Sequence, residues 1–380
     1  MTVLPLAREF TIRSSADHES ACRVDQVQVV PWGGLSDADR LRWRQLRATQ
    51  SELRTPFFSL AFFDAVQASR GDVLCAVMRS GGQVVGFLPF HRINHIAWPA
   101  GRFVNDAHNV VAHPDTTFDW CWLLKECQVK AYDFHSMVGS MSNIEQVSFQ
   151  GITESFRADL GNDSKQFLAG LEKQHKTIRR QEQKSRKLAR EIGPISIEID
   201  CRDPSILQQM IAWKRDQYRR TNILDLFTPE WTRNMVDQLH RSNGPDTRGL
   251  LSVLRAGDTI VAAHFGMLEN GLLHYWFPTY DTAFSRYSPG TALFKEIIRV
   301  ADRHGIRCID MGYGEQPYKR KQTDTITTVK HGCVTPSSVY RNMRAMRLAA
   351  TNVIKQFPMK TQLKQVLRTV QPNAGISKLQ

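Results

Sequence analysis

The sequence predicts a mixed α/β (α+β) fold in which most strands run antiparallel. Residues 74–90 (LCAVMRSGGQVVGFLPF) align without a gap to residues 250–266 (LLSVLRAGDTIVAAHFG). Each segment is a β-rich run, a Gly-containing turn and a second β-rich run, which is the pattern of a hairpin. An amphipathic stretch precedes each hairpin, at 60–68 and at 231–239. Although unrelated hairpins share this pattern, the repeated order favours a duplicated unit of helix and antiparallel strands.

The segment after the second hairpin predicts the rest of the unit. A β-rich run at 272–277 precedes a loop, and a helix is expected from Thr291 to His304 because apolar residues recur there at helical spacing. A further short strand, at residues 306–310, ends at Asp310 in a polar loop. The predicted sheet is therefore mixed, with helices packed on it.

Length and charge set the expected organisation. The chain has 380 residues, which is long for one hydrophobic core, so two domains are expected, either with two cores or as two halves of one larger sheet. The formal net charge is +13, and nine Lys or Arg lie between Lys165 and Arg190 against two Glu. Such a segment either attracts phosphates or is a solvated helix face. The predicted parts are a flexible N-terminus (1–25), an N-terminal domain (26–160), a basic connecting helix (161–195), a C-terminal domain (196–335) and a basic amphipathic tail (336–380).

The cysteines and the hydropathy pattern indicate the compartment. Seven cysteines are scattered without a Cys-x-x-Cys pair, which is typical of reduced core residues. No signal-like or membrane-spanning apolar run is visible. We therefore expect a cytoplasmic protein. Histidines 91, 95, 108 and 113 lack ligand spacing, so no metal site is predicted.

The loop that begins at Asp310 is the predicted active site. Asp310 and Glu315 are candidate carboxylates, Tyr318 is a candidate proton donor, and Gly312 and Gly314 allow the backbone to approach a substrate. An ion pair between Asp310 and the nearby Lys319 is the structural alternative. The other catalytic candidate is His264 on the second hairpin, which could act as a base or could be a hydrogen-bonded core histidine.

Four further side chains are candidate substrate ligands. Lys319 could bind an anionic group, and Tyr280 could position the acceptor. Lys214 and Tyr218 lie four residues apart on a predicted helix at 207–219 and so share a face, which is either a substrate surface or a solvated one. In the first repeat, Asn105 and Asp106 form a weaker candidate site, whose alternative is a plain Asx turn.

The helix after Ser288 and Pro289 is the candidate cofactor site. Its first turn contains Gly290, Thr291 and Ala292. Unpaired amides and the partial positive charge at a helix N-terminus bind pyrophosphate. An ordinary Ser-Pro-Gly helix start with nothing bound is the alternative.

These motifs together resemble the GNAT acyltransferase superfamily, and more specifically the BioF2-like or CelD (cellulose biosynthesis) type with two tandem GNAT-like domains. The likeness is carried by the basic segment 171–193, by Ser288-Pro-Gly-Thr291 and above all by DMGYGEQPYK at 310–319. It spans residues 57–330 and is distantly similar to the Fem-type peptidoglycan transferases. The resemblance implies transfer of an acyl group, with acetyl expected first, from acetyl-CoA or another acyl-CoA. The acceptor that it implies is a small molecule or glycan, namely an amine or hydroxyl of a sugar or of a cell-envelope or exopolysaccharide precursor.

The resemblance leaves the acyl donor open. GNAT enzymes typically carry Gln/Arg-x-x-Gly-x-Gly/Ala, whereas Arg286 lies one position too far from Gly290. A Fem-like transferase that uses aminoacyl-tRNA is therefore the alternative, and tRNA is the one nucleic acid expected to bind. A third reading is a non-enzymatic scaffold, peripheral at the inner face of the membrane. Residues 340–370 contain seven Lys or Arg and no acid, and could lie on an anionic membrane or, as most amphipathic helices do, pack on the protein body.

Overall fold

The computed structural model describes residues 22–139, 144–242, 244, 247–314 and 316–356. The described residues form one continuous mixed sheet, in the order β1-β2-β3-β4-β6-β13-β7-β12-β11-β10-β9-β8, with β5 paired to β3. The strands are β1 (Gln26–Pro31), β2 (Val73–Ser80), β3 (Gln83–Ile93), β4 (Ile96–Pro99), β5 (Val111–Ala112), β6 (Ala131–Met137), β7 (Val147–Asp159), β8 (Ile195–Ile199), β9 (Thr247–Ala256), β10 (Thr259–Glu269), β11 (Leu272–Tyr280), β12 (Cys308–Tyr313) and β13 (Thr325–Val334).

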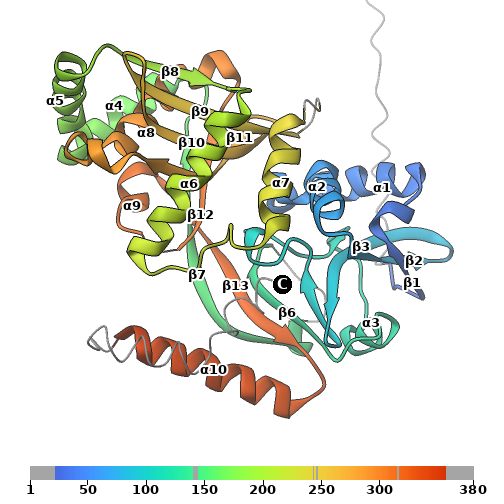
Figure 1. Cartoon of the computed structure of the whole chain (residues 1–380). Helices are drawn as coiled ribbons and strands as arrows, with labels where there is room; N and C mark the ends of the chain where they lie inside the picture. Colours follow the sequence, from blue (N-terminus) through green and yellow to red (C-terminus); the bar gives the residue numbers. More distant parts are fainter. Residues whose placement is uncertain (1–21, 140–143, 243, 245–246, 315, 357–380) are drawn as a thin grey trace, which may run out of the picture.

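Ten helices pack around this sheet in the described part of the chain (Figure 1). They are α1 (Asp37–Ala48), α2 (Leu60–Arg70), α3 (Trp120–Glu126), α4 (Ser164–Gln174), α5 (Lys176–Glu191), α6 (Pro204–Thr221), α7 (Glu230–Arg241), α8 (Pro289–Val300), α9 (Lys319–Gln322) and α10 (Ser338–Gln356). The predicted helices and hairpins at 60–68, 74–90, 207–219, 231–239 and 250–266 are thus present. The basic segment 161–195 contains two helices, α4 and α5, which meet at His175.

The same order of elements occurs twice. The first series is β1, α1, α2, β2, β3, β4, α3 and β6, and the second is β8, α6, α7, β9, β10, β11, α8 and β12. In each series the first four strands pair antiparallel with one another in order. The fourth and fifth strands then pair parallel: β4 with β6 in the first series and β11 with β12 in the second. The hairpin repeat in the sequence is therefore one part of a longer structural repeat.

Two long strands join the halves. β13 pairs antiparallel with β6 on one side and with β7 on the other, and β7 also pairs with β12. Figure 1 shows β7 and β13 running from one half of the molecule into the other. Where one half ends and the other begins stays a prediction, because the sheet is continuous.

Alternate residues of the strands contact helices on opposite faces of the sheet. One core contains Val253 of β9 and apolar side chains of α1, α2, α6 and α7 from both halves. A second core contains Leu254 of β9 and side chains of α4, α5 and α8. The helix α3 covers the N-terminal half through a third core. This alternation follows from the two-residue period of a strand buried on both faces.

Candidate functional site

The candidate site lies where the parallel strands β11 and β12 separate. Their described pairing consists of Leu272 with Cys308, Leu273 with Ile309 and His274 with Asp310, although β11 continues to Tyr280. Beyond this point the polar atoms of the two strands are available to other groups. The predicted strand end at Asp310 is therefore also the point where the sheet opens.

Asp310 is buried at this opening and both of its carboxylate oxygens are engaged. Oδ1 accepts a hydrogen bond of 2.7 Å from the Gly312 amide, and Oδ2 accepts one of 2.9 Å from Nε of Arg157 on β7. The partner of Asp310 is therefore Arg157, and the alternative of an ion pair with Lys319 is wrong. Gly312 and Gly314 have φ of +67° and +108°, so this turn requires the conformational freedom of glycine.

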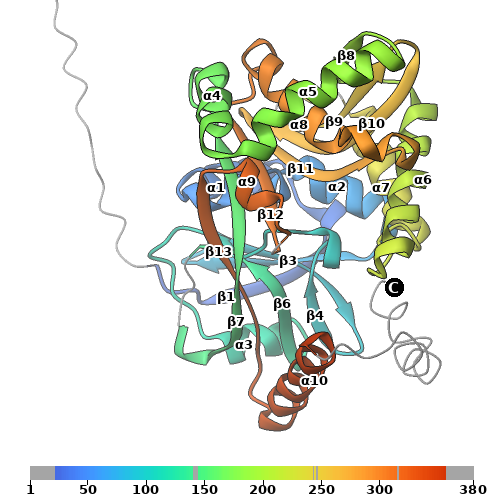
Figure 2. The ribbon, with the colours of Figure 1, turned by 90° about the vertical axis from the view of Figure 1, so that its left-hand side faces the viewer.

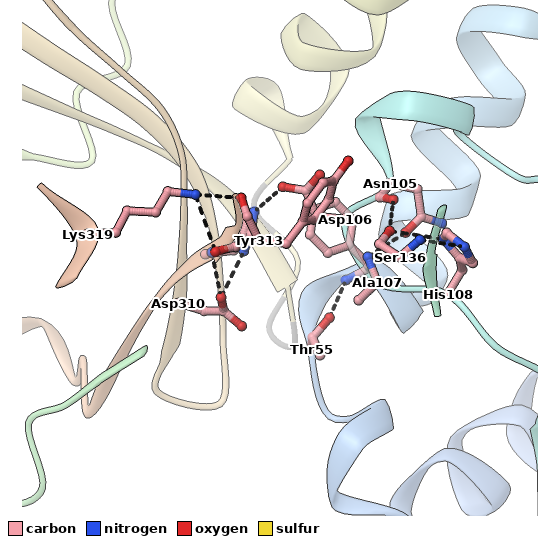
Figure 3. A network of polar contacts seen from close by, with 12 residues as sticks. Thr55, Asn105, Asp106, Ala107, His108, Ser136, Asp310, Tyr313 and Lys319 are labelled. Carbon is pink, nitrogen blue, oxygen red and sulfur yellow. Dashed lines mark hydrogen bonds and ion pairs between the residues drawn. The ribbon is translucent and has the colours of Figure 1, made fainter. Parts of the chain in front are cut away.

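His274 links Asp310 to the N-terminal half. Its Nε2 lies 3.2 Å from Oδ2 of Asp106, and its Nδ1 lies 3.9 Å from Oδ1 of Asp310. The ring packs edge-on against Phe57, with 4.6 Å between centroids. Figure 3 shows Asp106 on one side of this network and Asp310, Tyr313 and Lys319 on the other. Each nitrogen of this buried imidazole thus faces a carboxylate.

The loop that presents Asp106 is held by a dense local network. The side-chain oxygen of Asn105 accepts from the Ala107 amide, which is the Asx turn weighed for this sequence, and the Asn105 carbonyl accepts from Ser136 Oγ. The His108 backbone bridges to β6 beside Met137. The β4–β6 opening of the first half corresponds to the β11–β12 opening of the second half, but this loop fills it. The loop also directs Asp106 into the C-terminal half.

Two buried lysines approach the same opening. Nζ of Lys319 donates to the carbonyls of Tyr313 at 2.6 Å and Gly312 at 3.3 Å, and burial lowers its pKa to about 8, against the raising effect of Asp106 and Asp310. Nζ of Lys214 donates to the Pro278 carbonyl at 2.9 Å. Burial, followed by the charge of Lys319, lowers the pKa of Lys214 to about 7. Charged and neutral forms of both are therefore accessible near neutral pH.

The other candidate residues lie at different depths around this opening. Tyr218 is buried under Lys214, whose Nζ lies 5.3 Å from the ring centroid, and burial raises the pKa of its hydroxyl. Tyr318 keeps 42% of its surface exposed, while partial desolvation of its hydroxyl still raises its pKa to about 12. Glu315 lies outside the described residues.

His264 lies in the core, on the face of the sheet that packs on α8. Its ring stacks on Tyr275 with 4.0 Å between centroids, and burial lowers its pKa well below the usual value. Both ring nitrogens, the Tyr275 hydroxyl and the Ser252 hydroxyl lack a hydrogen-bond partner among the described residues. His264 is therefore separated by the sheet from the carboxylates, and a role as base stays a prediction.

The predicted cofactor segment forms the start of α8. Ser288 has φ of +54°, Pro289 is the first helical residue, and the amides of Thr291 and Ala292 donate to the Ser288 carbonyl. A Cβ on Gly290 would lie 3.5 Å from the ring of Tyr280, which therefore borders the helix start. Nζ of Lys184 on α5 donates to Ser288 Oγ at 2.7 Å. The basic helix thus brings a cation to this helix end.

A cleft of about 810 Å³ lies near Asp310 and His274, on the same side of the sheet. Leu272 and Cys308 line it, and His274 and Asp310 follow two residues later on the same strands, hence on the same face. Five arginines but only two carboxylates line its walls: Arg40, Arg44, Arg47, Arg54, Arg307, Asp64 and Glu269. Asp64 pairs with Arg40 and Glu269 pairs with Arg47. The cleft has an excess of positive charge and opens between the halves.

The described residues contain neither a metal-binding cluster nor a membrane-spanning helix. None of their His, Cys, Asp and Glu side chains gather in groups of three that could hold a metal ion. Among the same residues, no helix has both the length and the apolar character to cross a bilayer.

Sequence reasoning found only part of this site. It selected Asp310, Lys319, Lys214 and Tyr218, which the fold brings to one opening. It missed His274 and Lys184, because their partners lie 168 and 104 residues away in the sequence. It also missed the cleft, whose arginines come from α1, from the segment that follows α1 and from the residue before β12, and have no common motif.

Comparisons with known proteins identify the type of domain. Residues 172–320 match the family model described as "Acetyltransferase (GNAT) domain". Among curated proteins, none matches this chain. The order of strands, the parallel pair and the helix between them lie within the matched residues.

Solved structures share the fold over a larger part of the chain than the family model covers. FemX aligns with a TM-score of 0.55 and 11% identity, over 84% of this chain and 100% of that chain. A tandem GNAT protein from the clavulanic acid biosynthesis pathway aligns with a TM-score of 0.46 and 12% identity, over 82% and 100%. The C-terminal domain of a putative lysylphosphatidylglycerol synthetase from Agrobacterium fabrum gives 0.47 and 13%, over 82% and 95%.

The family match, the FemX alignment and the order of elements confirm the predicted fold class, a mixed and mostly antiparallel sheet flanked by helices in a GNAT-like arrangement that occurs twice. The residues matched by the family model contain the β11–β12 opening, the α8 start and Asp310. Residues 172–320 of this chain are thus similar to a GNAT acetyltransferase domain.

Proposed function

We propose that the protein transfers an acyl group, in the first instance acetyl, from an acyl-CoA to an amine or hydroxyl of an anionic sugar or cell-envelope precursor, as an enzyme of the BioF2-like or CelD type. The observation that carries the proposal is the opening between β11 and β12, with Asp310, His274 and Lys319 beside it and the start of α8 nearby. The GNAT domain match supports transferase chemistry at this opening.

The donor would approach from the α8 side. The amide of Gly290 and the ammonium of Lys184 at the Ser288 hydroxyl would hold its pyrophosphate, because a helix N-terminus and a cation both favour negative charge. When bound, acyl-CoA supplies a thioester carbonyl that an acceptor can attack. The exposed ring of Tyr318 lies where it could pack beside the pantetheine arm or the acceptor.

The acceptor would approach from the arginine-lined cleft. This cleft borders the first paired residues of β11 and β12, and its excess of positive charge favours a phosphorylated or carboxylated molecule. Arg44 and Arg54 on α1 and the following segment would contact such groups, with the nucleophile directed toward Asp106 and His274. Tyr218 and Lys214 form the opposite wall of the opening.

Proton transfer is assigned to Asp106 for a geometric reason. Both oxygens of Asp310 are already engaged, whereas the Asp106 side chain is 21% exposed and carries one described contact, to His274. Asp106 would take the proton as the acceptor attacks the carbonyl carbon and the C–S bond breaks. His274 and Asp310 act as positioning residues for Asp106, and the charge of Lys319 would stabilise the oxyanion.

Calorimetric binding of CoA to the purified chain is the test of the donor. We expect wild-type protein to bind CoA and acetyl-CoA, and Gly290→Glu to lose this binding because it places a carboxylate at the helix end. Gly170→Glu on α4 is the matched control, since that glycine is helical with open space around it, and it should bind like the wild type.

The outcomes separate the possible donors. Loss of binding in Gly290→Glu alone supports the acyl-CoA site, and the Asp106→Asn variant should then lower the transfer rate by about 100-fold or more. A folded wild-type protein that binds no CoA would rule out this donor. The basic helix α5 and the shift of Arg286 relative to Gly290 would then favour aminoacyl-tRNA, with binding that weakens steeply as salt increases.

A further inference from the structure

The C-terminal helix α10 is docked on the protein through its polar face. The Asp133 carboxylate of β6 accepts from the Tyr340 hydroxyl at 2.9 Å and from Nε and a terminal nitrogen of Arg344 at 2.7 and 2.8 Å. Gln150 on β7 contacts the Arg341 carbonyl at 3.3 Å and the Arg344 side chain. Tyr340 and Arg344 lie four residues apart, so they share the face that points to the sheet.

The apolar residues of the same helix point away from the protein. Val339, Met343 and Met346 are 67%, 42% and 63% exposed. Their spacing of four and three residues places them on one stripe, which is turned well away from Tyr340 and Arg344. The sequence favoured a helix that packs its apolar stripe on the protein body, and for Met343 and Met346 that prediction is wrong. The face with Tyr340 and Arg344 is half-buried against the sheet, and the stripe is left outside.

The charge around this stripe is positive. From residue 325 to residue 380 the chain has nine Lys or Arg and no Asp or Glu. Arg347 is exposed on α10 next to the stripe, and Arg341 is exposed on the other side of the helix. On the adjoining strand β7, Ile152 is 65% exposed, two residues from Gln150. Figure 2 shows α10 at the end of the molecule opposite to α4 and α5, clear of the candidate cofactor helix α8.

We propose that the outer face of α10 binds an anionic membrane surface. An apolar stripe bordered by Arg347, on a segment without acidic residues, inserts at the boundary between acyl chains and headgroups, and each cation near the surface adds roughly 1 kcal/mol. A second copy of the chain is a poorer occupant, because two such faces would bring like charges together. The docked polar face fixes the stripe outward, so the protein meets the membrane in one orientation.

Sedimentation of the full chain with lipid vesicles tests this proposal. We expect binding to phosphatidylcholine vesicles that contain about one-third phosphatidylglycerol, weaker binding to pure phosphatidylcholine and weakening by salt. The paired substitution Met343→Ser and Met346→Ser should reduce partitioning about tenfold or more, as loss of two apolar side chains implies. Leu41→Ser with Ile223→Ser is the control, since both residues are 55% exposed elsewhere on the molecule, and it should leave binding unchanged.

Four results would overturn the proposal. The wild type could fail to sediment with anionic vesicles, or the paired serine variant could bind as well as the wild type. Alternatively, light scattering could show a dimer that the serine variant loses, which would assign the stripe to a second copy. Removal of residues 357–380 should leave a clear difference between wild type and serine variant, and its disappearance would assign binding to that segment instead. None of these readouts depends on the acyl donor.

Discussion

Lys214 shows how a buried amine couples the candidate site to pH. Burial and the nearby charge of Lys319 lower its pKa from the ordinary lysine value of 10.5 to about 7. Above pH 7 the folded protein releases this proton, whereas the unfolded chain keeps it until about pH 10. The unfolded state therefore binds more protons between these limits, and stability from this group rises with pH across that window. Below pH 7 both states are protonated, and the whole cost of burying the charge remains.

Replacing Lys214 by methionine should remove this pH dependence. Relative to Lys214→Met, the wild type should gain about 1–2 kcal/mol in free energy of unfolding between pH 7 and pH 8.5, as the linkage relation implies. Urea unfolding at the two pH values measures the difference. Lys125→Met on α3, where the lysine is exposed, serves as the control and should show the same pH profile as wild type. A parallel pH profile for Lys214→Met would show that this amine is not desolvated.

The sequence could predict residues of this site only when their role is local. Asp310, Gly312 and Lys319 lie in one segment of ten residues, where charge and glycines follow an apolar run, so their proximity was predictable. His274 lies on a strand as one polar residue among apolar ones, and only the fold shows that Asp106 faces it. Lys184 was one of nine basic residues in its segment, and nothing in the sequence distinguishes the one that reaches Ser288.

At the scale of elements, β12 must stop pairing for the site to form. Its register with β7 shifts between Asp310 and Tyr313, and Gly312 lies at that shift with φ of +67°. A Cβ on Gly312 would lie 3.0 Å from Asp106 Oδ2 and 3.2 Å from His274 Cε1. Gly305, with φ of +68° and open space around it, has the same backbone requirement without these contacts.

Alanine substitutions at Gly312 and Gly305 distinguish the cost of the left-handed backbone from the cost of steric crowding by neighbouring side chains. Both Gly312→Ala and Gly305→Ala should cost about 1 kcal/mol for the left-handed conformation. Gly312→Ala should cost roughly 1 kcal/mol more, because Asp106 and His274 must move, as in other overpacked sites. It should also slow acyl transfer, while Gly305→Ala should not. Urea unfolding and rate measurements on both variants test this. Equal losses of stability would show that Asp106 and His274 move away from Gly312 at no measurable cost.

The elements themselves were largely predictable, and their boundaries follow from local chemistry. The helix at 60–68 was expected from its apolar pattern, and the structure shows why it spans Leu60–Arg70: Ser59 caps its start and Gly71 ends it in the left-handed region. The direction in which α10 faces was not predictable, because it depends on the buried Asp133, about 200 residues earlier in the chain.

At the scale of the molecule, the two repeats share one core. Apolar side chains of α1 and α2 pack with those of α6 and α7, and α2 contacts α7 directly. The strand β13 completes the sheet of the first half although it follows the whole second half in the sequence. The length of the chain predicted two cores or two halves of one larger sheet, and the continuous sheet corresponds to the second arrangement. The shared core depends on contacts between distant helices, which the sequence could not show. The halves are thus joined by one sheet and one core, although each also contributes to a further core of its own.

Arg47 and Glu269 test whether the halves unfold together. Arg47 on α1 donates to both carboxylate oxygens of the buried Glu269 on β10, with one contact at 2.6 Å, and so crosses between the repeats. Glu269→Gln leaves a guanidinium facing a neutral amide, which should cost about 3 kcal/mol. Because the core is shared, calorimetry should show one transition that moves to lower temperature without splitting.

Asp216→Asn, which breaks an exposed pair with Arg219 on α6, is the control and should shift the transition temperature little. Two separate transitions in the wild type, or a shift of only one part of the transition in Glu269→Gln, would mean that the repeats unfold as independent units despite their continuous sheet.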